Sequence, residues 1–195
     1  MSNQPILVTG FEPFGSHASN TSLQIVEALG AGGDPRLSCR VLPTSFRRAG
    51  ELIESWIETE TPAAVVMLGL AASAAGLRLE RFATNRDDSE SLDNDGELRK
   101  SAAIVKAAPE VYASTLPLER IAAAVRSRGT AVEFSLSAGG FVCNHVFYRA
   151  RHAIERRSLR LPCGFLHVPA THSGQLEPWL GAVRECLRVL LATLE

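Results

Sequence analysis

The sequence has no excess of positive charge, and this absence excludes several kinds of partner. Its 195 residues include 20 Lys and Arg against 21 Asp and Glu, which gives a formal net charge of −1. A nucleic-acid groove or a polybasic membrane surface needs a basic field. We therefore expect no nucleic-acid partner and no membrane partner.

Targeting and spanning segments are also lacking. No Lys or Arg precedes Arg36, so the N-terminus does not have the cationic start of a secretory signal peptide. The uncharged stretch from Ala63 to Leu77 is too short, and too broken by Gly69 and Gly76, to cross a bilayer. We expect a cytoplasmic protein.

The chain has only 4 cysteines, and no two of them form a CxxC pair. Its 5 histidines do not stand at zinc-ligand spacing from them. We therefore expect neither a metal nor a cofactor. Without an export signal the cysteines should be reduced, and Cys39, Cys163 and Cys186 fall in expected strands or helices where a small apolar side chain packs well.

Apolar runs and helical periodicities alternate from one end of the chain to the other. Expected strands lie at 6–9, 37–41, 63–68, 77–82, 131–136 and 163–168, and expected helices begin after Asn20, Ser45, Pro117, Gly140 and Gln175. This order predicts one α/β domain over 1–195, a three-layer α/β/α sandwich with a mostly parallel twisted sheet. Ligands of such sheets bind beyond the carboxyl ends of the strands.

Cys143 is the best placed cysteine for chemistry. It follows an expected strand and a Gly139-Gly140 turn, and it falls in the first turn of an expected helix. Unpaired backbone N–H groups and the helix dipole stabilise a thiolate there, and the same amides can hold an oxyanion. From position alone, a nucleophile and a buried apolar thiol remain equal alternatives.

A nucleophilic cysteine needs a base and a group that orients the base. His167, near the end of the last expected strand, is the natural candidate for the base, although a histidine in an apolar run is often only a core residue. His145 is too close to Cys143 in sequence to aim at it. Glu80 is the candidate orienting carboxylate, and the alternative is a surface pair with Arg81.

The remaining histidines have no such placement. His17, His152 and His172 fall in loops or on an exposed helix face and carry no expected role.

Two further groups of residues lend themselves to a structural or a binding interpretation. Phe11 and Phe14 lie in a turn after the first strand, where they can form an apolar ligand wall or pack into the core. An arginine-rich stretch follows Cys143, and we expect it to be the solvated face of a helix. Its members are Arg149, Arg151, Arg156, Arg157 and Arg160.

Several segments, in one order over nearly the whole chain, resemble the pyrrolidone-carboxylate peptidases (pyroglutamyl peptidase I), a family of cysteine peptidases. The strongest likeness is SAGGFVCNHVFY at 137–148, which is similar to the nucleophile motif of that family. The supporting segments are VTGFEPFG at 8–15, Asn20, LPTSF at 42–46, the ERxAxN pattern of Glu80 to Asn85, DNDG at 93–96, YASTLP at 112–117 and GFLHVP at 164–169.

The resemblance implies roles for particular residues. Cys143 would be the nucleophile, His167 the general base and acid, and Glu80 the group that orients His167. The pocket for the lactam ring would include Phe11, Phe14, Phe141 and Val142. The implied substrates are peptides with an N-terminal pyroglutamyl residue, and the implied assembly is a homo-oligomer, often a tetramer.

The chain departs from the family pattern after the third strand. Family members commonly have a Gln where Leu70 stands, and two glycines and an Arg where Ala72, Ser73 and Ala74 stand. These changes leave the implied triad intact. They keep open a related cysteine hydrolase of another small cyclic or acyl amide, and a non-catalytic ligand-binding module on the same fold is a further alternative.

Overall fold

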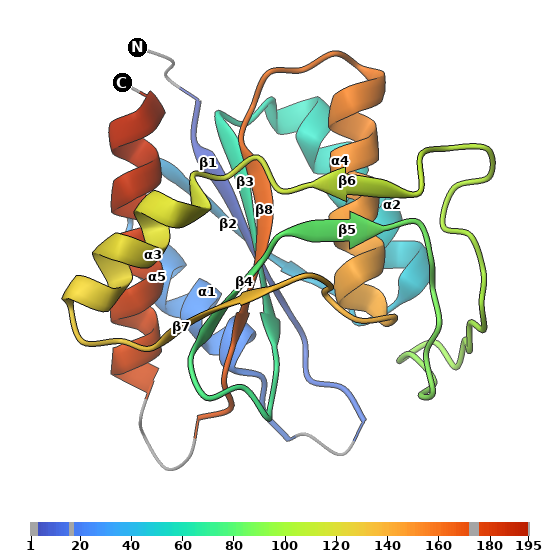
Figure 1. The fold of residues 1–195 in the computed structure, drawn as a ribbon, viewed down its shortest axis with the longest axis horizontal. Helices are drawn as coiled ribbons and strands as arrows, with labels where there is room; N and C mark the ends of the chain where they lie inside the picture. Colours follow the sequence, from blue (N-terminus) through green and yellow to red (C-terminus); the bar gives the residue numbers. More distant parts are fainter. Residues whose placement is uncertain (1–3, 16–17, 172–175, 195) are drawn as a thin grey trace.

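The computed structural model describes residues 4–15, 18–171 and 176–194, and these form three layers. A six-stranded sheet in the order β2-β1-β3-β8-β4-β7 lies in the middle (Figure 1). Its strands are β1 (Ile6–Phe11), β2 (Leu37–Leu42), β3 (Ala64–Leu70), β4 (Leu77–Glu80), β7 (Val132–Ser135) and β8 (Cys163–Val168).

Helices cover both faces of the sheet, as the alternation of elements predicts. Helices α1 (Thr21–Ala31), α3 (Leu118–Ser127) and α5 (Leu176–Leu194) share one hydrophobic core, on the left in Figure 1. Helices α2 (Phe46–Glu60) and α4 (Val142–Arg156) share the other, on the right. The expected α/β fold with a mostly parallel sheet is confirmed.

The strand directions are not uniform. Strands β2, β1, β3 and β8 run parallel to one another, whereas β4 pairs antiparallel with β8 and β7 runs parallel to β4. One edge of the sheet is therefore reversed. This reversal brings Glu80, at the end of β4, alongside Phe165 in β8.

Helix starts follow the side chains that cap them. Asn20 accepts a hydrogen bond from the Ser22 amide at 3.0 Å and begins α1, and Ser45 accepts one from the Arg48 amide at 3.2 Å and begins α2. Both helices begin where the sequence predicts. Helix α1 continues one residue past the expected stop at Gly30 and is capped at Gly32.

The expected strand at 77–82 is wrong in one respect, because the chain leaves the sheet at Arg81. Strand β4 ends at Glu80, and β5 (Phe82–Thr84) pairs with β6 (Val111–Ala113) in a separate two-stranded ribbon. Strand β6 was not expected. The ribbon lies against α4 (Figure 1), where the Arg151 guanidinium donates to the Ala113 carbonyl at 2.9 Å.

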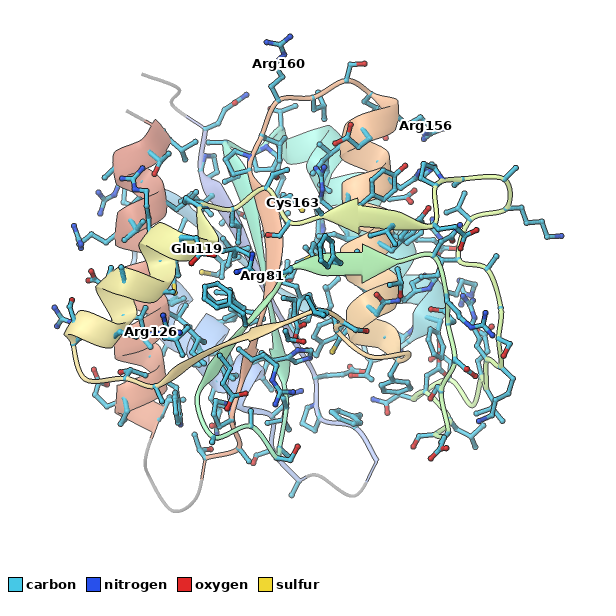
Figure 2. All side chains as sticks on the ribbon, viewed as in Figure 1. Arg81, Glu119, Arg126, Arg156, Arg160 and Cys163 are labelled. Atoms are coloured by element: carbon cyan, nitrogen blue, oxygen red, sulfur yellow. The ribbon has the colours of Figure 1, made fainter. Side chains whose placement is uncertain are left out.

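This contact corrects the interpretation of the arginine-rich face. Arg151 is 4% exposed, because it lies between α4 and the ribbon. Arg149 pairs with Glu54 of α2 and is half-buried. Arg156 and Arg160 are exposed and point away from the molecule, as expected (Figure 2).

The helices of the described ranges include none with the length and apolar character to cross a membrane.

Candidate active site

The pleat of the sheet puts two of the predicted chemical groups on the face that α4 covers. Side chains alternate between faces along a strand. Phe165 packs into the core under α2 and α4, so His167, two residues on, faces the same side. Leu79 packs into the opposite core, so Glu80 also faces α4.

His167 and Glu80 form a buried hydrogen-bonded pair. The imidazole Nδ1 of His167 donates to Glu80 Oε1 at 2.8 Å, with His167 6% and Glu80 0% exposed. Within the described residues, the second carboxylate oxygen of Glu80 is buried with no hydrogen-bond partner. Among the described residues, Glu80 therefore bonds to the side chain of His167 alone, and the other nitrogen of the ring points away from the carboxylate.

Arg81 is not the partner of Glu80. Its guanidinium pairs with Glu119 of α3 at 2.6 Å and lies over the Phe134 ring, 4.2 Å from its centroid. Figure 2 shows Arg81 and Glu119 between α3 and the sheet. The alternative of a surface Glu80–Arg81 pair is wrong.

Cys143 reaches this pair from α4, in the space left by a glycine. Gly69 in β3 is the register partner of His167 in β8. A Cβ atom placed on Gly69 would lie 2.9 Å from Cys143 Sγ and 2.7 Å from Phe165 Cζ. The thiol therefore lies over Gly69, next to His167, near the carboxyl ends of β3 and β8.

The charges of the three side chains are coupled. Burial lowers the pKa of His167, but hydrogen bonds and charge interactions with Cys143 and Glu80 outweigh burial and raise this pKa from 6.5 to about 9. The imidazole is therefore protonated near neutral pH. An imidazolium beside a sulfur favours the thiolate, which is the nucleophilic form of cysteine.

The start of α4 supplies backbone donors beside the sulfur. Phe141 is the N-cap residue and makes no side-chain capping hydrogen bond. The first N–H groups of a helix have no partner within it. In α4 these amides belong to Val142, Cys143 and their neighbours, and they can hold an oxyanion that forms at the attacked carbonyl.

Only glycine fits the turn before this helix. Gly139 has a φ of 86°, in the left-handed region. A Cβ atom on Gly140 would collide with the carbonyl oxygen of Asp88.

Two aromatic rings meet near the start of α4. The Phe14 and Phe141 rings lie 5.7 Å apart and both are half-buried, so they can present a surface to a ligand. Phe11 is 2% exposed and packs on Phe165 at 6.3 Å, and Val142 is also buried. Of the four expected pocket residues, Phe14 and Phe141 are partly accessible, and we name this pair the candidate ligand wall, whereas Phe11 and Val142 are buried.

The other cysteines have the expected packing positions. Cys163 and Cys186 are buried, and burial raises the pKa of each thiol to about 12. Cys39 is half-buried, and burial raises its pKa as well. None of the three is a thiolate near neutral pH.

Two of the other histidines are tied to neighbours away from the sulfur. His145 Nδ1 donates to Asp87, and His152 is hydrogen-bonded to the Tyr112 hydroxyl at 3.0 Å. His152 is half-buried and not exposed as expected. His17 and His172 lie outside the described residues.

Sequence reasoning missed two residues of the site, Gly69 and Phe46. A glycine near the end of a buried strand is the signal for a close approach, and Gly69 has that position. Phe46 packs edge-on against Phe141 at 5.4 Å, from the first turn of α2. Only the packing of α2 against α4 reveals this contact.

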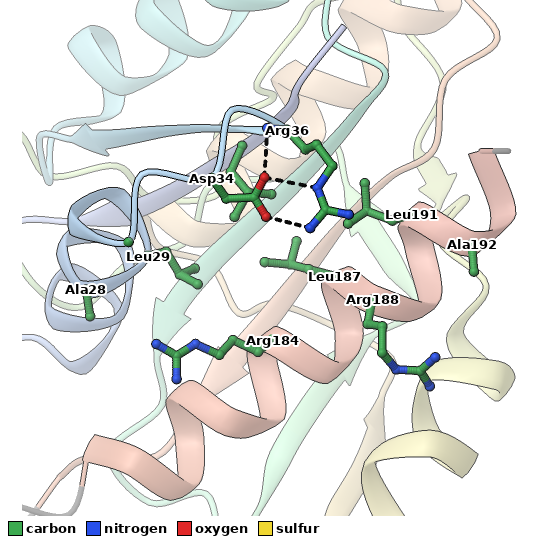
Figure 3. Close-up of a pocket in the computed structure, with 11 residues that line it drawn as sticks. Ala28, Leu29, Asp34, Arg36, Arg184, Leu187, Arg188, Leu191 and Ala192 are labelled. Carbon is green, nitrogen blue, oxygen red and sulfur yellow. Dashed lines mark hydrogen bonds and ion pairs between the residues drawn. The ribbon is translucent and has the colours of Figure 1, made fainter. Parts of the chain in front are cut away.

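A hollow elsewhere on the molecule offers no competing chemistry. It has a volume of about 500 Å³ and lies between the end of α1 and α5 (Figure 3). Its arginines pair with carboxylates, as Arg36 does with Asp34, Arg184 with Glu177 and Arg188 with Glu185. None of the triad residues lines it.

Comparisons with known proteins find relatives of one peptidase family. The family model described as pyroglutamyl peptidase matches residues 4–180. A pyrrolidone-carboxylate peptidase of Streptococcus pyogenes is 36% identical over 165 residues, covering 84% of this chain and 77% of that protein. One from Bacillus cereus is 30% identical over 188 residues, covering 92% and 87%.

Solved structures show the same likeness over almost the full chain. The pyrrolidone carboxyl peptidase of Thermococcus litoralis superposes with a TM-score of 0.91 at 32% identity, covering 98% of this chain and 94% of that one. That of Pyrococcus furiosus gives 0.92 at 33% identity, covering 98% of this chain and 100% of that one. A cysteine, a histidine and a glutamate that meet over a glycine, in a fold and sequence shared at this level, place the chain in the pyroglutamyl peptidase family of cysteine peptidases.

Proposed function

We propose that this chain is a cysteine exopeptidase that hydrolyses the amide bond after an N-terminal pyroglutamyl residue. Cys143 is the nucleophile, His167 the general acid and base, and Glu80 the group that orients His167. The observation that supports these roles is the meeting of three side chains from α4, β8 and β4 beside Gly69.

The first half-reaction forms a thioester. The Cys143 thiolate attacks the pyroglutamyl carbonyl carbon, and the carbonyl oxygen becomes an oxyanion that the first amides of α4 stabilise. The C–N bond then breaks as the His167 imidazolium gives its proton to the leaving amine. The shortened peptide leaves, and pyroglutamate stays bound to sulfur.

The second half-reaction consumes water. Neutral His167 takes one proton from a water molecule as the water oxygen attacks the thioester carbonyl, and the C–S bond breaks to release pyroglutamic acid, which gives its remaining proton to the solvent as pyroglutamate. The proton remains on the imidazole and the negative charge returns to sulfur. The ion pair of the resting enzyme is restored, with Glu80 holding the ring throughout.

The aromatic wall suits the substrate. A pyroglutamyl group carries no ammonium, so its recognition requires no acidic side chain. Its flat lactam ring fits between apolar faces such as those of Phe14 and Phe141, and backbone groups can satisfy its N–H and C=O. We place the ring against this wall, with Phe11 and Val142 supporting it from behind.

Cleavage of a fluorogenic pyroglutamyl aminomethylcoumarin amide tests the proposal. Wild-type protein should release the fluorophore, and Cys143→Ser should lower kcat/KM by about 1000-fold or more because the hydroxyl is a far weaker nucleophile in this setting. Cys39→Ser is the matched control, since Cys39 is half-buried and has no contact with the triad, and should keep full activity. Unchanged turnover by Cys143→Ser would remove Cys143 from the mechanism.

A panel of amides tests the substrate class. Leu70 is half-buried and Ala72 and Ser73 are exposed in the turn after β3, where the chain departs from the family pattern. We expect the pyroglutamyl amide to be the best substrate among pyroglutamyl, prolyl, N-acetyl-alanyl and larger-ring lactam amides. A higher kcat/KM for another member of the panel would favour the related-hydrolase alternative, and no cleavage of any member would favour a ligand-binding module.

We further propose that residues 1–195 act as one peptidase domain in the cytoplasm, as a homo-oligomer with no nucleic-acid or membrane partner. The family resemblance supports the oligomer, and the near-neutral charge supports the absence of a nucleic-acid groove. Light scattering after gel filtration measures the oligomer mass, and a monomer mass at micromolar concentration would contradict this part of the proposal.

A further inference from the structure

A second buried histidine–carboxylate pair lies beside the active site and takes no part in the proposed reaction. His145 Nδ1 donates to Asp87 Oδ2 at 2.8 Å, and the Arg99 guanidinium donates to the same oxygen at 2.9 Å. Asp87 is 0% and His145 1% exposed. Burying a carboxylate is costly even when it is paired, so this arrangement calls for a role.

The pair is closed to substrate. Within the described residues, His145 Nε2 has no hydrogen-bond partner, and it faces α2, where a Cβ atom on Gly50 would lie only 2.8 Å from it. No substrate atom fits in that space. His145 therefore cannot serve as a second general base.

Asp87 instead holds one aromatic ring from two sides. The imidazole of His145 packs edge-on against Phe46, with ring centroids 5.6 Å apart. The guanidinium of Arg99 lies over Phe46, 4.8 Å from its centroid. Because both groups bind the same oxygen of Asp87, that carboxylate sets the position of Phe46, which packs on Phe141 of the ligand wall at 5.4 Å.

The backbone around Asp87 is tied independently to the start of α4. Asn144, next to the nucleophile, accepts a hydrogen bond from the Thr84 amide at 2.9 Å and donates to the Arg86 carbonyl at 3.0 Å. The Asp88 amide donates to the Gly140 carbonyl at 2.9 Å. These bonds do not involve the Asp87 side chain, so a change of that side chain leaves the nucleophile in place.

We propose that Asp87 is a positioning residue for substrate binding: through His145 and Arg99 it holds Phe46, and through Phe46 it holds Phe141 against the lactam ring. The proposal rests on the proposed function. It separates two parts of the site, because the Asp87 carboxylate governs the shape of the pocket while Glu80 governs the nucleophile and base. Asp87 touches neither substrate nor the reacting atoms.

The variant Asp87→Asn tests this role, because it keeps the shape of the side chain and removes its charge. We expect KM for the fluorogenic pyroglutamyl amide to rise about tenfold, which corresponds to losing part of one charged hydrogen-bond system. The kcat and the rate of Cys143 alkylation by iodoacetamide should stay within about twofold of wild type, since the triad is untouched. Arg99→Gln is the second variant, for use if Asp87→Asn does not fold. Arg99 is partly exposed, and its replacement should raise KM in the same way.

The control is Glu185→Gln on α5, a buried carboxylate paired with Arg188 far along the chain from the site. It should lower thermal stability without raising KM. An unchanged KM in Asp87→Asn, or an equal rise in Glu185→Gln, would overturn the positioning role.

Hydrogen–deuterium exchange separates failure of this role from failure of the proposed function. In Asp87→Asn we expect faster exchange in peptides that cover Phe46 and Phe141, relative to wild type and to Glu185→Gln. If wild-type protein cleaves no pyroglutamyl amide, the proposed function is wrong, and the exchange result alone then decides whether Asp87 holds the two rings. Unchanged exchange in both peptides would refute the role of Asp87 in holding Phe46 and Phe141.

Discussion

Replacing Gly69 with alanine adds one methyl group where three parts of the site converge. The new Cβ would lie 2.9 Å from Cys143 Sγ and 2.7 and 2.8 Å from two atoms of the Phe165 ring. Non-bonded heavy atoms pack at about 3.5 Å or more. The sulfur must therefore move by about 0.6 Å and the ring by about 0.8 Å, or β3 must shift away from α4.

Such a displacement is large on the scale of catalysis. A misplacement of about 1 Å between reacting groups costs about 100-fold in rate, so we expect Gly69→Ala to lower kcat/KM for the pyroglutamyl amide by roughly that factor. The methyl group also overpacks the core, at about 1–3 kcal/mol of folding free energy. Steady-state kinetics well below the melting temperature, with circular dichroism to verify folding, measure the two effects separately.

Gly181→Ala is the matched control. Gly181 lies in α5, where an added Cβ meets no atom within 4 Å, so alanine should raise helix stability by up to about 1 kcal/mol and leave activity unchanged. A folded Gly69→Ala protein with kcat/KM within about threefold of wild type would show that the sulfur does not depend on the space over Gly69, and the geometry argued for the triad would be wrong.

Four further outcomes follow from the contacts in and around the site. In Cys143→Ala, the pKa of His167 should fall below its value of about 9, because burial lowers this pKa and one of the two partners that raise it is gone. An NMR titration of the labelled imidazole measures the pKa. An unchanged value would contradict the coupling of His167 to Cys143. The folded state raises this pKa from 6.5, so its stabilisation is complete below pH 6.5 and is lost as the pH rises through about 9; urea unfolding across that range should show a steeper loss for wild type than for Cys143→Ala. Phe14→Ala should raise KM for the pyroglutamyl amide about tenfold with little change in kcat, because we propose that this half-buried ring contacts the lactam and not the reacting atoms. A fall in kcat alone would argue against its place in the wall. Asn144→Ala leaves several buried backbone groups without a partner, and a fall in melting temperature larger than that of a surface substitution should result; a melting temperature equal to wild type would show that water replaces the lost bonds.

Local sequence patterns predict the positions of some residues of the candidate active site and not of others. Cys143 at a helix start and His167 near a strand end follow from periodicity and turn residues, and both were found that way. Glu80 was a candidate from its position after the third strand, but only the family resemblance gave it a definite role, because a single carboxylate followed by Arg81 has no local signature of burial. Its hydrogen bond to His167 depends on the pairing of β4 with β8, which are far apart in sequence.

Partners that are distant in sequence account for the corrected expectations as well. Arg151 was expected on the solvated face of its helix, but β6 covers it, and the Ala113 carbonyl of that strand accepts its hydrogen bond. Phe11 was expected in a turn, but it is the last residue of β1 and packs against Phe165. In both cases the deciding neighbour comes from an element that local patterning does not reveal.

By itself the sequence determined most of the elements, their order and the caps of α1 and α2, because apolar periodicity, Asn20 and Ser45 act over a few residues of backbone. It also determined which thiol lies at the start of a helix. Only the tertiary structure decided that β4 and β7 run antiparallel to the other four strands of the sheet, that Gly69 leaves the space for Cys143 Sγ and that the Asp87 carboxylate lies where it can support Phe46. These features arise from contacts between segments far apart along the chain, whose free energies exist only once the layers have packed.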